Sequence, residues 1–596
     1  MKNVIFIVCD GLSYDMVRDL PNHKSPMHFL NSLKEKSIWC NNAYSQGPYT
    51  ESGIMGLCYG RNPLDEGAYM YGYQEWPNSQ YKVFREAGYC LFNSYFGSFT
   101  PPEFMTEGQY IYAVNYADPM FSRYIRSKLD YYCALYKGNT LTAEDYIYIK
   151  KLMTMHFKTM FMFMAEHCLK NDLTGDYSVY ERDNTKYLND IKDWKVQMQV
   201  EYETFIKAPN DYITNIFKNY DTHFITTGCN IQNAPMRHVV KEQREWVKKN
   251  YESFFEDIKK KNKIYFRKNK QFPFKEIIRQ FKNARSKKKF RKGLEYIYRT
   301  KQAYADLELT KMVDTNINQV ATSARAFTRS LADWIEKRIE GKPFFSYLHL
   351  DEFHRPLSFY SHDIIDKSLV IAEMDAAIKY VNTLPTDYKG NIGFDLSAQY
   401  LDNSIKELYN YLDSKNLLKE TILVITADHG SSNFGGNIRY TVTNNFYKEQ
   451  YHIPCIIVGL GNKEINSYVD IKDIPFTVLQ QCGLPIPETF TGSSILESSK
   501  SSSFVEYLGG GVPDLQRRPV LKAYINDNVV IVLSGNLRTK EIELLEYYDL
   551  KNDPCQLVNI KNQICIDSIS TYVSDFKERL KALELNFDNW LKKDDC

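Results

Sequence analysis

Three features that would narrow the function are missing from this sequence of 596 residues. No uninterrupted apolar run approaches the ~18–20 residues that a membrane-spanning helix needs, so no such helix is expected. The twelve cysteines form no C-x-x-C pair and no dense framework, which indicates reduced thiols rather than structural disulfides. The net charge is only +2, so the field of the whole chain favours no class of partner.

The chain also opens without the pattern of a secretory signal peptide. Its first residues, MKNVIFIVCDG, predict a strand followed directly by an acidic turn. The most apolar long window, residues 146–169, is interrupted by lysines and histidine, which is typical of a packed or interfacial helix. These observations predict a cytoplasmic protein that is soluble or attached peripherally to a membrane.

What the chain does contain is a set of short apolar runs separated by helical patterns. Residues 3–8, 344–350, 420–426 and 452–460 are rich in apolar and β-branched residues, as the buried strands of a parallel sheet are. Helical periodicity lies between them, for example over residues 400–417. Strands that alternate with helices in this way predict an α/β fold.

The middle of the chain differs from both ends, and we interpret it as a large, mostly helical insertion. Residues 105–330 are rich in Tyr, Lys, Phe and Asn and poor in Gly. The α/β core is then formed by residues 1–104 and 331–504. Residues 505–596 contain short strand-like pieces and a final helical pattern, which predict a small antiparallel sheet and a terminal helix.

One part of the insertion is strongly basic. Residues 258–301 carry 18 Lys and Arg against two Glu, with aromatic residues between them. Such a segment is either a set of solvated helix faces or a docking surface for an anionic membrane or polymer, and both interpretations stay open. No nucleic-acid recognition motif accompanies the charge, so a nucleic-acid partner is not expected.

Acidic turns follow two of the predicted strands. Asp10 comes just after residues 3–8, and Asp428 and His429 follow residues 420–426. In open α/β sheets, ligands collect beyond the carboxyl ends of the strands, so both turns can face one crevice. A single Asp at a strand end is most often a helix N-cap. Two such turns, one of which also carries the imidazole of His429, together offer ligands that suit a divalent cation.

The stretch GPYTESGIMGLCYGRNP, residues 47–63, contains three side chains that can act as nucleophiles: Thr50, Ser52 and Cys58. Thr50 precedes a predicted helix, where its structural role would be that of an N-cap. The same place offers free backbone N–H groups and a partial positive charge, which suit a phosphate. A hydroxyl there becomes a good nucleophile when a metal ion lowers its pKa.

Eight segments in order resemble the sulfatase-like branch of the alkaline phosphatase superfamily. They are IFIVCDG, TESGIMGLCYGRNP, FREAGY, KPFFSYLHLDEFHRP, YLDNSIKELYNYLDSKNLLKETILVITADHG, YKEQYHIPCIIVG, VDIKDIPFTVLQQCGLPIPETFTGSSIL and YYDLKNDPCQLVNI. The resemblance covers roughly residues 1–100 and 330–560. It implies a three-layer sandwich around a mostly parallel central sheet. It also implies that Asp10, Asp428 and His429 are metal ligands.

Within that resemblance, the register of Gly60 and Arg61 places Thr50, rather than Ser52 or Cys58, at the nucleophile position, where it also contacts the metal. Sulfatases need a Cys or Ser there, followed by x-Pro-x-Arg, for conversion to formylglycine, and this chain has neither the residue nor the motif. Thr nucleophiles are typical of the phosphoethanolamine transferases, lipoteichoic acid synthases and phosphodiesterases among the relatives. The resemblance therefore implies a metal-dependent phosphoryl hydrolase or transferase that forms a phosphothreonine intermediate. A sulfatase and a catalytically inactive sulfatase-like binding protein are the alternatives.

The segment LHLDEFHRP adds further candidates. His354 matches the active-site His of sulfatases, which implies contact with the substrate phosphate or the leaving group. His349, Asp351 and His452 are candidates for a second metal or substrate site, although His349 can equally be a core histidine and His452 a strand-start residue. The implied cofactor is one or two divalent ions (Zn, Mn, Ca or Mg). The implied substrate is a phosphate ester, with a surface glycan or a lipid as its carrier left open.

Overall fold

The structure is a computed structural model, and most of the chain outside the central region can be described. The described residues are 1–20, 24–66, 78–93, 109–110, 136, 143–167, 185–219, 222–223, 225, 324–337, 341–350, 352–353, 392–431, 446–497, 499–508 and 519–593. Asp351, His354 and the basic segment 258–301 lie outside this set.

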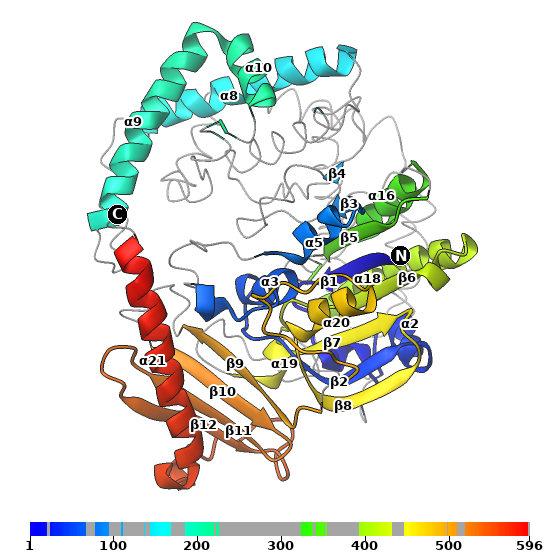
Figure 1. Ribbon diagram of the computed structural model, residues 1–596, viewed down its shortest axis with the longest axis vertical. Coiled ribbons are helices and arrows are strands. Elements are labelled where there is room, and N and C mark those ends of the chain that lie inside the picture. Colours follow the sequence, from blue (N-terminus) through cyan, green and yellow to red (C-terminus); the bar gives the residue numbers. More distant parts are fainter. Residues whose placement is uncertain are drawn as a thin grey trace, which may run out of the picture.

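An eight-stranded sheet forms the centre of the molecule (Figure 1), in the order β4-β3-β5-β1-β6-β7-β2-β8. The strands are β1 (Asn3–Cys9), β2 (Ile38–Tyr44), β3 (Cys90–Asn93), β4 (Gln109–Tyr110), β5 (Phe344–Leu350), β6 (Thr421–Thr426), β7 (His452–Val458) and β8 (Lys463–Asp470). Of these eight described strands, β7 alone runs antiparallel to its neighbours, so the sheet is mostly parallel.

The middle strands follow directly from their sequences. Every residue of β1, β5 and β6 is buried, because apolar side chains point to both faces of a sheet that is covered on both sides. The strands predicted over residues 3–8, 344–350 and 420–426 are therefore confirmed. The run 452–460 is also a strand, but its antiparallel direction could not be read from its composition.

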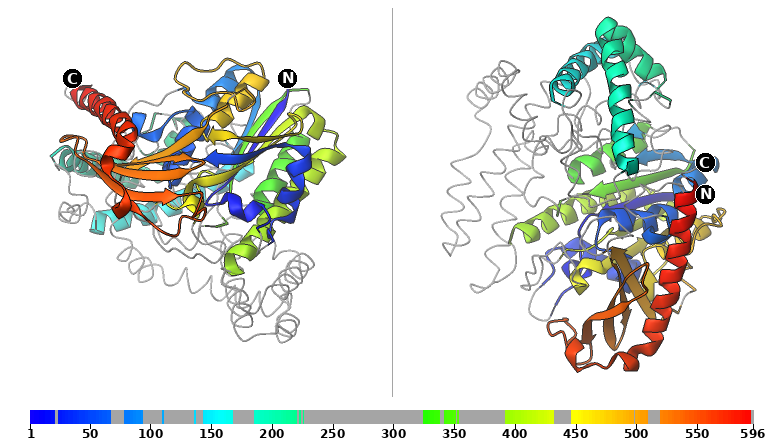
Figure 2. Two further views of the ribbon diagram at one scale, coloured as in Figure 1. Left: turned by 90° about the horizontal axis from the view of Figure 1, so that it is seen from below. Right: turned by 90° about the vertical axis from the view of Figure 1, so that its left-hand side faces the viewer.

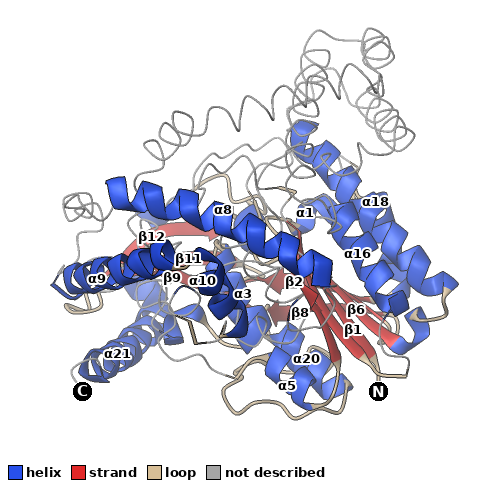
Figure 3. Ribbon diagram, turned by 90° about the horizontal axis from the view of Figure 1, so that it is seen from above, coloured by secondary structure: helices blue, strands red, loops and turns tan. Residues whose placement is uncertain are grey.

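Helices cover both faces of this sheet and complete the expected three-layer sandwich (Figure 3). One layer contains α1 (Tyr14–Val17), α2 (His28–Ser32), α16 (Ala324–Lys337) and α18 (Ile392–Ser414), and the other contains α3 (Thr50–Tyr59), α5 (Gln80–Glu86) and α20 (Asp473–Gln481). Helix α18 shows why these segments pack here. Its buried residues Leu401, Ile405, Leu408 and Leu412 recur every three or four positions and form one apolar face.

Three helices of the insertion lie beyond the β3–β4 edge of the sheet (Figures 1 and 2). They are α8 (Ala143–His167), α9 (Thr185–Lys207) and α10 (Pro209–Lys218), which contact one another. Along α8, Ile149, Met153, Phe157 and Phe161 are fully buried at intervals of four residues, so this helix packs by one face. Among the described residues, no helix is long and apolar enough to cross a membrane.

The C-terminal part forms the expected small antiparallel sheet with a terminal helix across it (Figure 2). Its elements are β9 (Ser502–Leu508), β10 (Val520–Asn526), β11 (Val529–Gly535), β12 (Ile542–Asp549) and α21 (Ser570–Lys593). The short helix α19 (Lys448–Tyr451) belongs to the central part and directly precedes β7. Phe576 and Leu580 of α21 pack on the sheet in a separate apolar cluster. The Arg579 guanidinium pairs with Glu506 of β9 and with Asp65, 2.6 Å away, which ties α21 to the segment after α3.

Candidate metal and nucleophile site

The candidate site lies where three parallel strands end. Asp10 directly follows β1, and Asp428 stands two residues beyond β6. On the other side of β1, His349 of β5 is in register with Val8. Because β1 pairs in parallel with both β5 and β6, the three carboxyl ends meet at one edge of the sheet.

The predicted metal ligands come together at this edge. One ligand atom from each of Asp10, Asp428 and His429 lies within 4.8 Å of the other two. His429 Nε2 is 3.3 Å from Asp10 Oδ1 and 3.8 Å from Asp428 Oδ2. Two buried carboxylates and an imidazole that converge in this way form a donor set suited to a divalent cation.

The surrounding backbone fixes which atoms of these residues face the cluster. Asp428 Oδ1 accepts hydrogen bonds from the N–H groups of Gly11 (3.4 Å) and His429 (2.8 Å). Asp428 Oδ2 is buried and accepts no hydrogen bond from the described residues, so it is left for another ligand. His429 Nδ1 lies 2.8 Å from the Gly430 carbonyl oxygen, which accepts its proton and leaves Nε2 as the ligating nitrogen.

The charge around His429 also fits a cation. Burial alone would lower the pKa of His429, but the carboxylates of Asp428 and Asp10 raise that pKa to about 10. A proton held so firmly marks a site with an excess of negative charge. The residues therefore fit a divalent cation by both donor chemistry and charge.

Thr50 points into this cluster. Its hydroxyl donates to Asp10 Oδ2 over 3.2 Å and lies 3.3 Å from His429 Nε2. Thr50 is the first residue of α3, whose N-cap is Tyr49, so Thr50 lies inside the helix rather than before it, as the sequence had suggested. The hydroxyl is thus directed to the cluster rather than used as an N-cap.

The other two possible nucleophiles are arranged differently. Ser52 is buried, and its hydroxyl donates to the Tyr49 carbonyl oxygen over 2.7 Å. Cys58 lies within α3 and is also buried. Of the three candidates in this stretch, Thr50 is the one whose side chain contacts Asp10 and His429.

Close packing holds α3 against the loop that carries Asp428. A Cβ atom added at Gly53 would collide with the Asp428 carbonyl oxygen, so only glycine permits this approach. The same carbonyl accepts a hydrogen bond from Ser45 Oγ over 2.6 Å. The role of Ser45 was not predicted, because nothing in its local sequence indicates a contact with residue 428.

Two of the additional histidines can be placed. His349 is brought to the site: its Nε2 lies 3.1 Å from Asp10 Oδ2 and 3.8 Å from Asp428 Oδ2. His452 is not. Its Nε2 lies 2.8 Å from the Asn41 carbonyl oxygen, and its ring stacks on Tyr44 with the centroids 4.9 Å apart. A second metal site that includes His452 is therefore not formed by the described residues.

Comparison with known proteins also finds similarity to sulfatases, at low sequence identity. A family model described as Sulfatase matches residues 197–484. Bovine arylsulfatase K is 28% identical over 172 residues, which are 27% of this chain and 31% of the relative. A lipoteichoic acid synthase of Staphylococcus saprophyticus is 27% identical over 126 residues, 21% of this chain and 17% of the relative. The chain thus spans about a third or less of these curated relatives.

One solved structure extends the comparison to the whole fold. It was described in work on the metabolism of multiple glycosaminoglycans by Bacteroides thetaiotaomicron. It superposes with a TM-score of 0.51 at 11% sequence identity, and the match covers 98% of this chain and 96% of the solved chain. At this identity the likeness concerns the fold alone.

The fold is the alkaline-phosphatase-like sandwich that the sequence led us to expect, with a carboxylate and imidazole cluster at the edge of its mostly parallel sheet. Over residues 197–484 the chain is similar to the Sulfatase family, and the arylsulfatase K relatives agree with this similarity. The resemblance found in the sequence is thereby confirmed.

Proposed function

We propose that the protein is a metal-dependent enzyme that hydrolyses or transfers a phosphoryl group through Thr50. The observation that supports this most strongly is the direction of the Thr50 hydroxyl, which lies within 3.3 Å of both Asp10 and His429 at the start of a ten-residue helix. Threonine has no route to formylglycine, so this position favours direct attack by a hydroxyl.

Asp10, Asp428 and His429 would hold the cation, since their buried donor atoms converge and carry excess negative charge. When bound, a divalent cation supplies positive charge that favours ionisation of a nearby hydroxyl and neutralises phosphate oxygens. The backbone N–H groups at the start of α3 add partial positive charge on the same side as Thr50.

In the proposed step, Thr50 Oγ1 forms a bond to phosphorus while the bond from phosphorus to the leaving oxygen breaks. The hydroxyl proton passes to Asp10 Oδ2, the acceptor that Thr50 already faces. The leaving oxygen takes a proton from solvent or from an imidazole, a role that the sequence gives to His354. Water or an acceptor hydroxyl then displaces Thr50 Oγ1 and releases the phosphoryl group.

The relatives support two substrate classes. The lipoteichoic acid synthase relative is named for the synthesis of a phosphate-containing polymer, which agrees with phosphoryl transfer. The arylsulfatase K relatives favour sulfate esters, and sulfate-ester hydrolysis is accordingly the second candidate. Thr50 decides between them in our proposal, because it cannot supply the formylglycine that sulfatases use.

A substrate panel tests the proposal. Phosphate monoesters, phosphate diesters, phosphonates and aryl sulfates are assayed with Mn²⁺, Zn²⁺, Mg²⁺ and Ca²⁺, with T50A as the matched variant. We expect metal-dependent turnover of a phosphorus ester that T50A lacks. Faster release of sulfate than of phosphate would overturn the phosphoryl assignment. A folded protein that binds no metal and turns over nothing would indicate a binding protein instead.

A further inference from the structure

The segment that carries Asp428 and His429 has no regular structure of its own. It follows β6, and residues 428–431, here called the ligand loop, belong to no helix or strand among the described elements. One contact from outside is a backbone hydrogen bond, in which the Gly430 N–H donates to the Gln450 carbonyl oxygen over 2.8 Å. The positions of the two predicted metal ligands therefore depend on groups beyond the ligand loop.

Ser13 holds the far end of the ligand loop. Its buried hydroxyl donates to the Ser431 carbonyl oxygen over 2.8 Å and accepts from the Ser431 N–H over 3.2 Å. Ser13 is the N-cap of α1, where a serine hydroxyl usually accepts from the N–H groups of its own helix. It accepts none of these from the described residues of α1. The hydroxyl therefore serves the ligand loop rather than the helix that it precedes.

Ser45 holds the near end of the ligand loop. It is fully buried directly after β2, and its Oγ lies 2.6 Å from the Asp428 carbonyl oxygen and 2.8 Å from that of Gly47. A hydroxyl has a single proton to donate, and the shorter contact is the one to Asp428. The Ser45 N–H donates to the Tyr451 carbonyl oxygen over 2.8 Å, so the serine is itself fixed.

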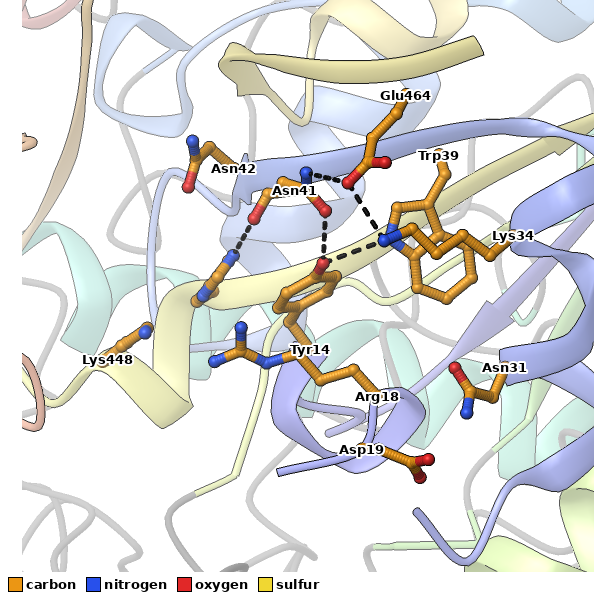
Figure 4. Close-up of a pocket in the computed structure, with 11 residues that line it drawn as sticks. Tyr14, Arg18, Asp19, Asn31, Lys34, Trp39, Asn41, Asn42, Lys448 and Glu464 are labelled. Atoms are coloured by element: carbon orange, nitrogen blue, oxygen red, sulfur yellow. Dashed lines mark hydrogen bonds and ion pairs between the residues drawn. The ribbon is translucent and has the colours of Figure 1, made fainter. Parts of the chain in front are cut away.

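Both serines are anchored to the same strand, β2. Tyr14 comes directly after Ser13, and its hydroxyl donates to Asn41 Oδ1 over 2.7 Å and accepts from Trp39 Nε1 over 3.1 Å (Figure 4). Trp39 and Asn41 belong to β2, which ends just before Ser45. The two hydroxyls that bind the ligand loop are therefore held by one frame.

We propose that Ser13 and Ser45 are positioning residues, which clamp the ligand loop so that Asp428 and His429 face the cation. Without the Ser45 hydroxyl, the buried Asp428 carbonyl oxygen lacks this donor, which costs free energy unless the loop shifts. A shift of the loop moves the ligand atoms, because both ligands belong to it. This inference rests on the cation site proposed above and adds to that site two residues outside the ligand set.

The test compares S13A and S45A with a matched control in the full-length protein. The control is S37A, since Ser37 is also fully buried and its hydroxyl donates to the Leu33 carbonyl oxygen over 2.8 Å rather than to the ligand loop. S13T keeps a hydroxyl and tests rescue. Calorimetry measures the affinity for Mn²⁺, and the visible absorption of bound Co²⁺ reports the coordination geometry. Hydrogen exchange of peptides that contain residues 428–431 is measured without metal, and urea unfolding checks the fold.

We expect S13A and S45A each to weaken Mn²⁺ binding about tenfold and to change the Co²⁺ spectrum. Exchange of the ligand loop should become faster in both variants. S13T should bind the metal nearly as wild type does, and S37A should match wild type in affinity, spectrum and exchange. If S45A does not fold, the comparison of S13A with S13T decides.

Two results would overturn the inference, and they differ in what they say about the cation site. Wild-type protein that binds Mn²⁺, with folded S13A and S45A that bind it as tightly and exchange as slowly, would exclude the clamp and leave the cation site intact. Wild-type protein that binds neither Mn²⁺ nor Co²⁺ would overturn the cation site and the clamp together.

Discussion

Two histidines near the same edge of the sheet behave in opposite ways. His429 lies between two carboxylates, which raise its pKa to about 10, whereas burial and Lys448 lower the pKa of His452 to about 3. His429 presents Nε2 to Asp10 and Thr50, and His452 gives its Nε2 proton to a backbone carbonyl. The partners of each ring, rather than its burial, therefore decide whether it can serve a cation.

The difference separates two kinds of environment. Excess negative charge at His429 is useful only if a cation balances it, which fits a metal centre. The neutral ring of His452, hydrogen-bonded to the Asn41 carbonyl oxygen and stacked on Tyr44, fits a structural role. The following predictions test that separation, beginning with the largest expected effect.

Removal of the Thr50 hydroxyl should have the largest effect. T50A is expected to lower turnover of a phosphorus ester by at least about 10³-fold, because the attacking atom is gone. T50S keeps a hydroxyl and is the matched control, with substantial activity. Steady-state kinetics and far-UV circular dichroism together check the loss and the fold. Equal activity in T50A and wild type would exclude Thr50 as the nucleophile.

A substitution at Gly53 tests whether activity and metal binding depend on the position of α3. In G53A, the added methyl group must push α3 away from the Asp428 carbonyl, and we expect about a 10²-fold loss of activity and weaker metal binding. G56A is the matched control on the same helix, since its added methyl group meets the Ile471 side chain instead. Metal titrations on both variants measure the difference. Equal metal affinity in the two would contradict a role for this contact.

Metal binding should depend on pH because of His429. A cation binds the neutral ring, so the proton that His429 holds below a pH of about 10 must be released. Apparent metal affinity should therefore rise as the pH increases, by at most about tenfold per pH unit in this range. Calorimetry in buffers of different ionisation enthalpy measures the protons released. An affinity that is constant between pH 6 and 9 would contradict the raised pKa.

The pKa of His452 is shifted in the opposite direction, and its effect, on stability, should be smaller. Its folded pKa lies below the unfolded value of about 6.5, so its neutral form stabilises the fold above that pH. This stabilisation should be lost as the pH falls from about 6.5 towards 3. Urea unfolding across that window should show a shallower decline for H452Q than for wild type. Imidazole NMR that shows His452 protonated near pH 6 would refute the assignment.

The sequence predicts the centre of the fold well and its edges less well. The strands β1, β5 and β6 are continuous apolar runs, which a two-sided buried sheet requires. The strands β2 and β8 were not predicted, since their sequences IWCNNAY and KEINSYVD contain polar residues that suit the outer part of a sheet. Their place depends on pairing with β7, which no local pattern specifies.

The residues of the candidate site were also predicted only in part. Asp10, Asp428 and His429 follow predicted strands directly, so the parallel order of the sheet brings them together. His452 was a candidate for a second site or simply a strand-start residue; it is the first residue of β7, and its ring stacks on Tyr44 and bonds the Asn41 carbonyl oxygen instead of the cluster. The direction of a side chain at a strand end depends on register, which the sequence alone does not give.

The most direct test of the central claim is to trap the phosphoryl group on the protein. Wild-type protein with metal and a turned-over phosphate ester is quenched in acid, digested and analysed by tandem mass spectrometry. We predict one phosphoryl group on the peptide that contains Thr50, at Thr50 itself, formed and lost at rates that account for turnover. Steady turnover of that ester with no phosphorylated Thr50 at any time of quenching, and with T50A equally active, would contradict the account.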